Sequence, residues 1–394
     1  MDTIYMDQLT TLIPKGDGVE EAMEAAVNMD ISDIQTMADE TREQLNKLFH
    51  GPGPDSVVFT SGVDAALDGL IRALFKDGDH VLISSMENDT VMNALNAIGH
   101  EADEGVSGGV EYTRIPCNEK GQLIFFDPIK GEKGFDAVEK LLRPNTKAVI
   151  VNHASEVCGT ILQAKEISEL ARRHGLLVIV NAAQTAGCVP IFMNIWGVDL
   201  MTFSGGYGLF ASEKIGGFIA SERAAAMLGL LTFVWLCLCA SVVEEFEQKP
   251  LDAVAIAGLH KAFEFIEEKT LHTLSSMGRQ RVEQFIRKVQ HVNGVHIIGP
   301  GYKDRIPVIS IQTDFMEESE LEEALKNQYG IVMCSGLHNA EEAHKTLGTY
   351  PRGTARFSFN YFNTEEEVEK LTQALWQLTV HSDKVADVKR MPKE

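Results

Sequence analysis

The chain has 394 residues, of which 44% are hydrophobic, enough to bury one large core and a second, smaller one. Its formal net charge of -22 opposes the phosphate backbone of nucleic acids and the anionic face of membranes, so we expect neither as a partner. Six cysteines without a C-x-x-C pair or a zinc-type spacing, and an acidic N-terminus where a signal peptide would be basic, predict a cytoplasmic protein with no disulfide framework and no metal site.

Short apolar runs bounded by turn residues alternate with helical periodicities through the first half of the chain. The runs begin at Val57, His80, Ala148, Leu176 and Leu200. Runs of this length that alternate with amphipathic helices are typical of strands buried on both faces. The pattern therefore predicts an α/β fold with a mostly parallel sheet flanked by helices.

The pattern changes from about Leu251. Two long amphipathic helices come first, followed by the strand IPVISIQ, the short helix SELEEALKN, the strands IVMCS and TARFSF, and a closing helix. We expect a large domain at 15–250 and a smaller α+β domain at 251–380. The N-terminal segment 1–14 is expected to pack with the small domain, and 381–394 to form a loosely held polar tail.

One uncharged stretch, residues 224–243, reads AAAMLGLLTFVWLCLCASVV. It is long enough to span a membrane by length alone. Because α/β patterns lie on both sides of it, we interpret it as a buried helix and expect no membrane association.

Two motifs, VIVNAAQTAG and DLMTFSGGYG, resemble those of class V aminotransferases of the cysteine desulfurase and selenocysteine lyase branch. The resemblance runs from Ile4 to about Leu378 and includes YMDQLTT, VFTSGVDAALDGLIRAL, GDHVLISSMENDTVMNAL, NHASEVCGTI and HKTLGTYPRGTARFSFNYFNTEEEV. It implies the pyridoxal phosphate (PLP) dependent transferase fold of type I, with a large sheet of seven-stranded type. It also implies a PLP site at the carboxyl ends of the large-domain strands and a dimeric assembly.

The family's reactive positions carry other residues in this chain. Tyr207 stands in place of the lysine that forms the Schiff base, Gly206 in place of a phosphate-binding histidine, and Asn339 in place of the nucleophilic cysteine. Covalent PLP catalysis needs that amine, and persulfide chemistry needs that thiol. We do not expect Lys214, seven residues beyond Tyr207, or Cys334, which we interpret as an inert buried thiol, to replace them.

Positions that hold the cofactor in the family are altered as well. Asn88 replaces a ring-stacking histidine, and Asn181 replaces the aspartate that pairs with the pyridinium nitrogen. Glu156 replaces an asparagine that contacts the ring oxygen and substrate. Val63 and Asp64 occupy the phosphate-binding turn, where a carboxylate would repel phosphate, so we expect Asp64 to act as a helix N-cap.

Three positions match the family. Gln184 corresponds to the glutamine that bonds the phenolic oxygen of PLP, Ser204 to a phosphate-binding serine, and Arg356 to the arginine that holds the substrate carboxylate. The resemblance thus implies a vestigial PLP site.

The leading hypothesis is a catalytically inactive protein that serves as a non-catalytic subunit. It would form a homodimer, or a heterodimer with an active paralogue, through an interface at residues 224–250. Two alternatives stay open: a divergent PLP-dependent lyase or transferase with a noncovalently held cofactor, and an amino-acid-binding sensor that uses Arg356.

Overall fold

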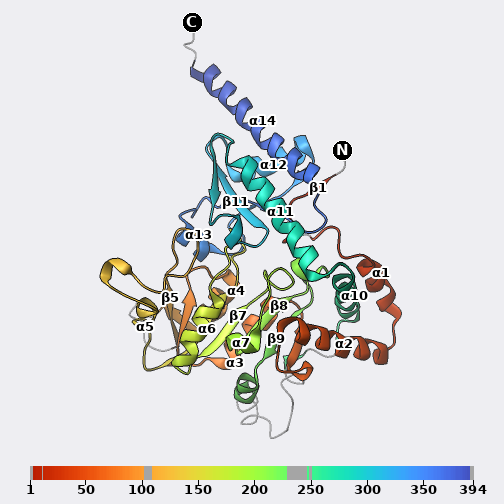
Figure 1. The fold of residues 1–394 in the computed structure, drawn as a ribbon, viewed down its shortest axis with the longest axis vertical. Helices are drawn as coiled ribbons and strands as arrows, with labels where there is room; N and C mark the ends of the chain where they lie inside the picture. Colours follow the sequence, from red (N-terminus) through yellow and green to blue (C-terminus); the bar gives the residue numbers. More distant parts are fainter. Residues whose placement is uncertain (1–2, 11, 102–108, 229–245, 248–250, 391–394) are drawn as a thin grey trace.

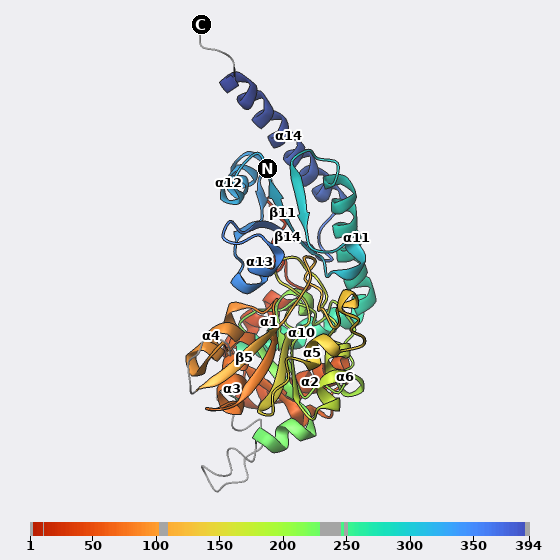
Figure 2. The same ribbon diagram turned by 90° about the vertical axis from the view of Figure 1, so that its left-hand side faces the viewer.

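The structure is a computed structural model that describes residues 3–10, 12–101, 109–228, 246–247 and 251–390. Two sheets organise these residues. The larger sheet and its helices form the lower part of Figure 2, and the smaller sheet with α11, α12, α13 and α14 lies above it. The two parts meet where the strands of the larger sheet end, and this junction positions the site described below.

The larger sheet has eight strands in the described part of the chain, in the order β2-β9-β8-β7-β6-β3-β5-β4. Every neighbouring pair is parallel except those of β9, which is antiparallel to β2 and β8. The predicted α/β fold with a mostly parallel sheet is confirmed, and the three-residue edge strand β4 makes it one strand larger than expected. The strands are β2 (Val57–Thr60), β3 (His80–Ser84), β4 (Gly99–Glu101), β5 (Val110–Ile115), β6 (Thr146–Asn152), β7 (Leu177–Asn181), β8 (Leu200–Ser204) and β9 (Gly216–Ala220).

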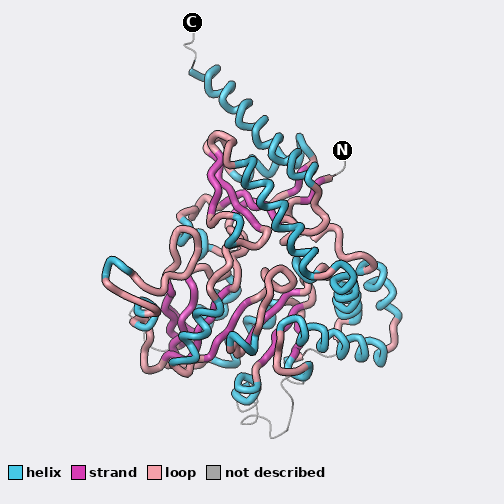
Figure 3. The backbone as a smooth tube through the Cα atoms, in the orientation of Figure 1, coloured by secondary structure: helices cyan, strands magenta, loops and turns pink. Residues whose placement is uncertain are grey.

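Helices cover both faces of this sheet, as Figures 1 and 3 show. Alternate strand residues feed two separate cores: Val57 and Phe59 belong to one, and Val58 to the other. The first core is closed by α2 (Ile31–Phe49), α6 (Ala164–Arg173) and α10 (Ala253–Lys269), and the second by α3 (Val63–Leu74) and α4 (Asp89–Ile98). The short helices are α1 (Val19–Ala25), α5 (Asp136–Glu139) and α7 (Met193–Trp196).

The smaller sheet is antiparallel, in the order β10-β11-β14-β13, and it packs on α11 and α14 through a core that contains Phe285 and Phe357. The N-terminal strand β1 (Ile4–Tyr5) pairs in parallel with β12 (Ile331–Val332), so the start of the chain lies beside this sheet. The remaining elements are β10 (Val295–Ile298), β11 (Val308–Thr313), β13 (Cys334–Gly336), β14 (Thr354–Ser358), α11 (Leu271–Val289), α12 (Glu318–Tyr329), α13 (Glu341–Leu347) and α14 (Glu365–Arg390).

The segment from His381, expected as a loosely held polar tail, is helical for most of its length. Helix α14 continues to Arg390 and projects from the body in Figure 1. Residues 381–390 contain no glycine or proline to end the helix, and they include several good helix formers. The domain boundaries themselves stay a prediction.

Most of the uncharged stretch 224–243 lies outside the described residues. Its first residues continue a helical segment at 222–228, where Ala224 and Leu228 are buried in the core beneath α3 and α4. Within the described ranges, no helix is long and apolar enough to cross a membrane.

Candidate functional site

A cavity of about 650 Å³ lies at the carboxyl ends of the large-sheet strands, where the smaller sheet meets them. It brings together predicted site residues that are far apart in sequence. Those in its wall are Asp64, Asn88, Glu156, Gln184, Ser204, Gly206, Tyr207, Asn339 and Arg356, together with Lys214 and Cys334. Asn181 is buried at the end of β7 and is not part of the wall.

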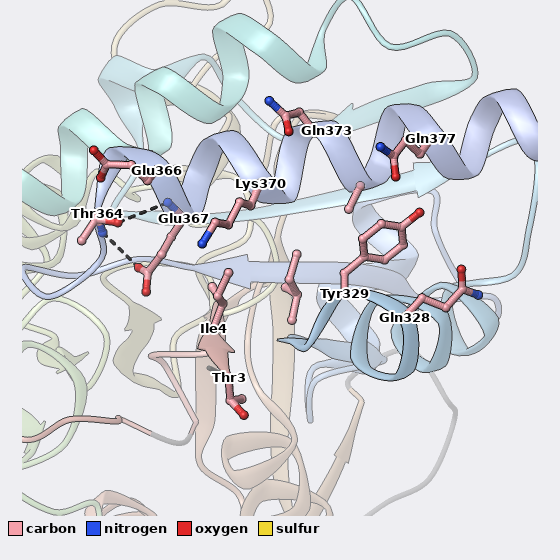
Figure 4. Close-up of a pocket in the computed structure, with 12 residues that line it drawn as sticks. Thr3, Ile4, Gln328, Tyr329, Thr364, Glu366, Glu367, Lys370, Gln373 and Gln377 are labelled. Atoms are coloured by element: carbon pink, nitrogen blue, oxygen red, sulfur yellow. Dashed lines mark hydrogen bonds between the residues drawn. The ribbon is translucent and has the colours of Figure 1, made fainter. Parts of the chain in front are cut away.

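A second cavity, of about 610 Å³, lies between α14, α12 and β1 (Figure 4). Tyr329 and Ile4 contribute apolar surface to it, and Lys370 and Glu367 contribute charge. It contains none of the predicted site residues, so the cavity at the strand ends is the candidate site.

Tyr207 is fixed in a structural contact between the two sheets. It opens the turn after β8, is 4% exposed, and its hydroxyl donates to the carbonyl oxygen of Phe359, which follows β14, at 3.0 Å. Burial raises the pKa of its phenol well above the usual value, so the hydroxyl keeps its proton. Its ring packs in a small apolar cluster with Ala154, Cys188, Ile306 and Val308.

The neighbouring residues of this turn differ in how tightly they are constrained. A Cβ at Gly208 would lie 2.1 Å from the carbonyl oxygen of Ala186, so that glycine is required by close backbone approach. At Gly206 a Cβ would meet Glu213 and Ser204 at 3.5 Å, an ordinary contact. A side chain at Gly206 is therefore sterically permitted.

Asn181 is held in a buried chain of amide hydrogen bonds. Its Nδ2 donates to Asn152 Oδ1 at 2.8 Å, and Asn152 Nδ2 donates in turn to the carbonyl oxygen of Met86 at 3.1 Å. Its Oδ1 accepts from the Thr202 hydroxyl and the Ala183 amide, both at 3.1 Å. An aspartate here would have no proton to donate to Asn152, so the amide fits this network better than a carboxylate.

The side chains of Asn88 and Glu87 are used in hydrogen bonds that hold the turn before α4. The Asn88 side chain caps α4 by accepting from the amide of Val91 at 3.1 Å. Glu87 is fully buried and accepts from the Ser84 hydroxyl and from the Asn152 amide. Burial raises the pKa of Glu87 to about 7.

Glu156 lies on the cavity wall with an incompletely bonded carboxyl group. Its Oε1 is shielded from solvent and has no hydrogen-bond partner among the described residues. Burial raises the pKa of Glu156 to about 8; Arg356 opposes this rise, whereas Asp64 and other nearby carboxylates reinforce it.

The expectation that Asp64 is an N-cap is wrong. Gly62 occupies the N-cap of α3, and its φ of 100° explains why this residue is a glycine. Asp64 lies in the first turn, where its charge still favours the helix dipole, and its Oδ1 accepts from the Thr90 hydroxyl at 2.8 Å.

Arg356 is only 4% exposed, and the N-terminal segment holds its guanidinium. Nη2 contacts Asp7 Oδ1 at 3.2 Å and Thr10 Oγ1 at 2.6 Å, and Nη1 donates to the carbonyl oxygen of Glu156 at 3.3 Å. Sequence reasoning missed Asp7 and Thr10. The signal available was that an arginine buried on a strand needs a carboxylate partner, and that the N-terminal segment was expected to pack here.

Cys334 is half-buried in the cavity wall, so its thiol is more exposed than the inert buried thiol that the sequence predicted. Its Sγ lies 3.6 Å from His338 Nδ1, and burial raises the pKa of the thiol. Asn339 has a φ of 54°, a left-handed conformation that asparagine tolerates, and its carbonyl accepts from the Asp89 amide. Lys214 is exposed on the wall beside Glu213.

The model of the family described as "Aminotransferase class-V" matches residues 22–371. A "Probable cysteine desulfurase" of Halalkalibacterium halodurans is 26% identical over 351 residues, which cover 85% of this chain and 80% of that protein. Another, of Mycolicibacterium paratuberculosis, is 24% identical over 86% of this chain but only 48% of its own length. The apo structure of a cysteine desulfurase from Thermococcus onnurineus shares the fold, with a TM-score of 0.80, 21% identity and coverage of 96% of this chain and 95% of that one.

Proposed function

The chain belongs to the class V aminotransferase family, and we propose that it is a non-catalytic member that keeps the fold without the family's PLP chemistry. Tyr207 carries the proposal. The Schiff-base position holds a buried phenol that keeps its proton and is bonded to Phe359, and a phenol cannot form an imine with an aldehyde.

We infer that the remaining residues do not fit PLP either. The amide of Asn181 provides no charge for a pyridinium nitrogen, and its hydrogen bonds are taken by Asn152, Thr202 and a backbone amide. Asn88 has no aromatic face to stack on a ring and is used as a helix cap. Asp64 places a carboxylate at the start of α3, the kind of position where helix amides bind phosphate.

The cysteine in the cavity wall, Cys334, does not support a role in sulfur transfer. Asn339 has no nucleophilic sulfur, and the raised pKa of Cys334 keeps that thiol protonated near neutral pH. We propose instead a role in assembly, as a homodimer or as the silent partner of an active paralogue. The interface proposed for residues 224–250 falls almost entirely outside the described residues, so its support is the apolar sequence alone.

One observation favours a second candidate, a divergent PLP-dependent lyase or transferase. Gln184 and Ser204, which match cofactor contacts of the family, lie on the wall of one cavity and are the residues available to hold PLP noncovalently. Lys214 lies on the same wall and is the nearest amine for a covalent variant of this candidate. The contacts of Arg356 weigh against the third hypothesis, an amino-acid sensor, because Asp7 and Thr10 already occupy one end of the guanidinium.

Two measurements after incubation with PLP test both candidates: the absorbance of bound PLP detects a noncovalently held cofactor, and reduction with borohydride followed by peptide mapping detects a covalent one. We expect no PLP-modified lysine within the cavity and no release of sulfide from cysteine. Modification at Lys214 that disappears in Lys214→Ala, but not in the matched surface variant Lys165→Ala, would contradict the proposal and support the divergent enzyme. Lys165 is an exposed residue of α6 and serves as the control.

A further inference from the structure

We propose that the turn between α1 and α2 is a docking surface for a basic amphipathic helix of a partner protein. The inference rests on the proposed role in assembly and names the chemistry of the partner. The two helices lie at the lower right edge of the molecule in Figure 1, so their junction is open to a partner.

The buried stripe of α2 continues beyond the part of the helix that packs on the large domain. Ala38, Thr41 and Leu45 are buried, and Ile34 and Ile31 extend the same alternating spacing of three and four residues to the start of the helix. Exposure rises along this line, because Ala38 is buried, Ile34 is half-buried and Ile31 is 79% exposed. A stripe with this spacing is the surface on which a second helix packs.

A second large apolar side chain is exposed at the same turn. Val27, in the short 3-10 turn Ala26–Asn28 between the two helices, is 70% exposed. By contrast, Met23 of α1 and Met37 of α2 pack against the core of the large domain. The two helices are thus anchored to the protein, whereas Val27 and Ile31 present apolar surface that a partner can bury.

The charges around the turn indicate the charge of the partner. Residues 16–41 contain eight carboxylates and no lysine, arginine or histidine. Three of the eight have basic partners elsewhere in the chain. Glu24, Asp30 and Asp33, which flank Val27 and Ile31 in sequence, form no ion pair with any described residue. An apolar stripe with an acidic border complements a helix that carries lysine or arginine beside its own apolar stripe.

A second copy of this chain fits the surface poorly. It would bring another formal net charge of -22 to a region that is already acidic. A two-fold axis through the turn would also set Asp30 and Asp33 of one copy against the same residues of the other. The partner is therefore a different protein with a basic surface.

Fluorescence anisotropy with a labelled model peptide tests the inference. The peptide has leucine at the a and d positions of each heptad and lysine at the others, and its counterpart has glutamate in place of every lysine. We expect the lysine peptide alone to bind, with an affinity that falls as salt is added, because salt screens exposed charges. Asp30→Asn combined with Asp33→Asn should weaken binding and reduce its salt dependence.

The apolar side chains are tested by a double variant, Val27→Ser with Ile31→Ser. It should weaken the lysine peptide at least about tenfold, because the burial of two aliphatic side chains is lost. The matched control is Ile195→Ser, at a residue of α7 that is 72% exposed, and it should bind as the wild type does. Both variants change exposed positions, so their midpoints of urea unfolding should equal that of the wild type.

No binding of the lysine peptide, equal binding of the glutamate peptide, or an equal loss in Ile195→Ser would each overturn the inference. A wild-type dimer in sedimentation that Ile31→Ser dissociates would show that a second copy covers the turn. A lower urea midpoint in Ile31→Ser would show that the chain covers it itself, and either result would also overturn the inference. The PLP measurements remain separate, since a PLP-modified lysine would overturn the non-catalytic function and not the docking surface.

Discussion

Replacement of Glu156 by glutamine is expected to stabilise the protein at alkaline pH. The folded protein raises the pKa of this carboxyl group from 4.5 to about 8, chiefly because burial disfavours the charged form. Folding therefore favours the protonated acid. The contribution to stability is complete below about pH 4.5 and is lost as the pH rises through about 8, the value in the folded state.

The size of the effect follows from the same pKa. A tenfold change in proton affinity is about 1.36 kcal/mol, so a rise from 4.5 to about 8 corresponds to about 5 kcal/mol for a group fully removed from water. Glu156 lies on the wall of a cavity that solvent can enter, and water there stabilises the ionised form. We therefore expect about 2 kcal/mol of added stability in Glu156→Gln at about pH 9.

Urea unfolding at a series of pH values measures the difference between the variant and the wild type. Near pH 4 the two free energies of unfolding should agree within about 0.5 kcal/mol, because Glu156 is then protonated in the folded protein and mostly protonated in the unfolded chain. The difference should grow as the pH rises. The control variant Glu119→Gln, which changes an exposed turn residue, should show no such trend. A Glu156→Gln variant that is equally or less stable at about pH 9 would refute the reasoning.

Three further variants test other parts of the structure by the same unfolding measurement. Tyr207→Phe should lower the free energy of unfolding by about 1–3 kcal/mol, because the Phe359 carbonyl loses its buried donor, and an unchanged value would show that this bond is not formed. Arg42→Met should lower it by about 3 kcal/mol or more, because the Glu247 carboxylate, 2.5 Å from the guanidinium, would remain buried without its partner. Gly206→Ala should leave it within about 0.5 kcal/mol, and a loss above 2 kcal/mol would contradict the spacing at that turn.

The sequence predicted the features that depend on local patterns. Apolar runs such as that at Val57 identified the strands, and their alternation with helices identified the α/β sheet. The family resemblance, drawn from motifs around Asn181 and Tyr207, is confirmed by the match over residues 22–371. Several of the predicted residues, such as Glu156 and Ser204, lie at the carboxyl ends of strands of one sheet, and the structure gathers them in one cavity with Arg356 of the smaller sheet.

The hydrogen bonds that hold Arg356 and Tyr207 in the site could not be predicted from the sequence, because they join distant parts of the chain. Arg356 meets Asp7 across 349 positions, and Tyr207 meets Phe359 across 152. Neither pairing leaves a periodic signal in the sequence, and for Arg356 the available signal was only the need for a carboxylate partner and the expected packing of the N-terminal segment. The unpaired oxygen of Glu156 is likewise a feature of the folded protein that the residue type alone does not reveal.

Tyr207 and Asn181 have hydrogen-bond partners of their own, and this bears on what the side chains expected from the family resemblance would do in their place. A lysine at Tyr207 would leave the Phe359 carbonyl without its phenol donor and would place an amine in an apolar cluster, where burial disfavours its charged form. An aspartate at Asn181 would set a carboxylate oxygen against Asn152 Oδ1, with no proton to share. Each single replacement would thus disrupt a satisfied contact, so we expect these positions to behave as a coupled set and not as independent ones.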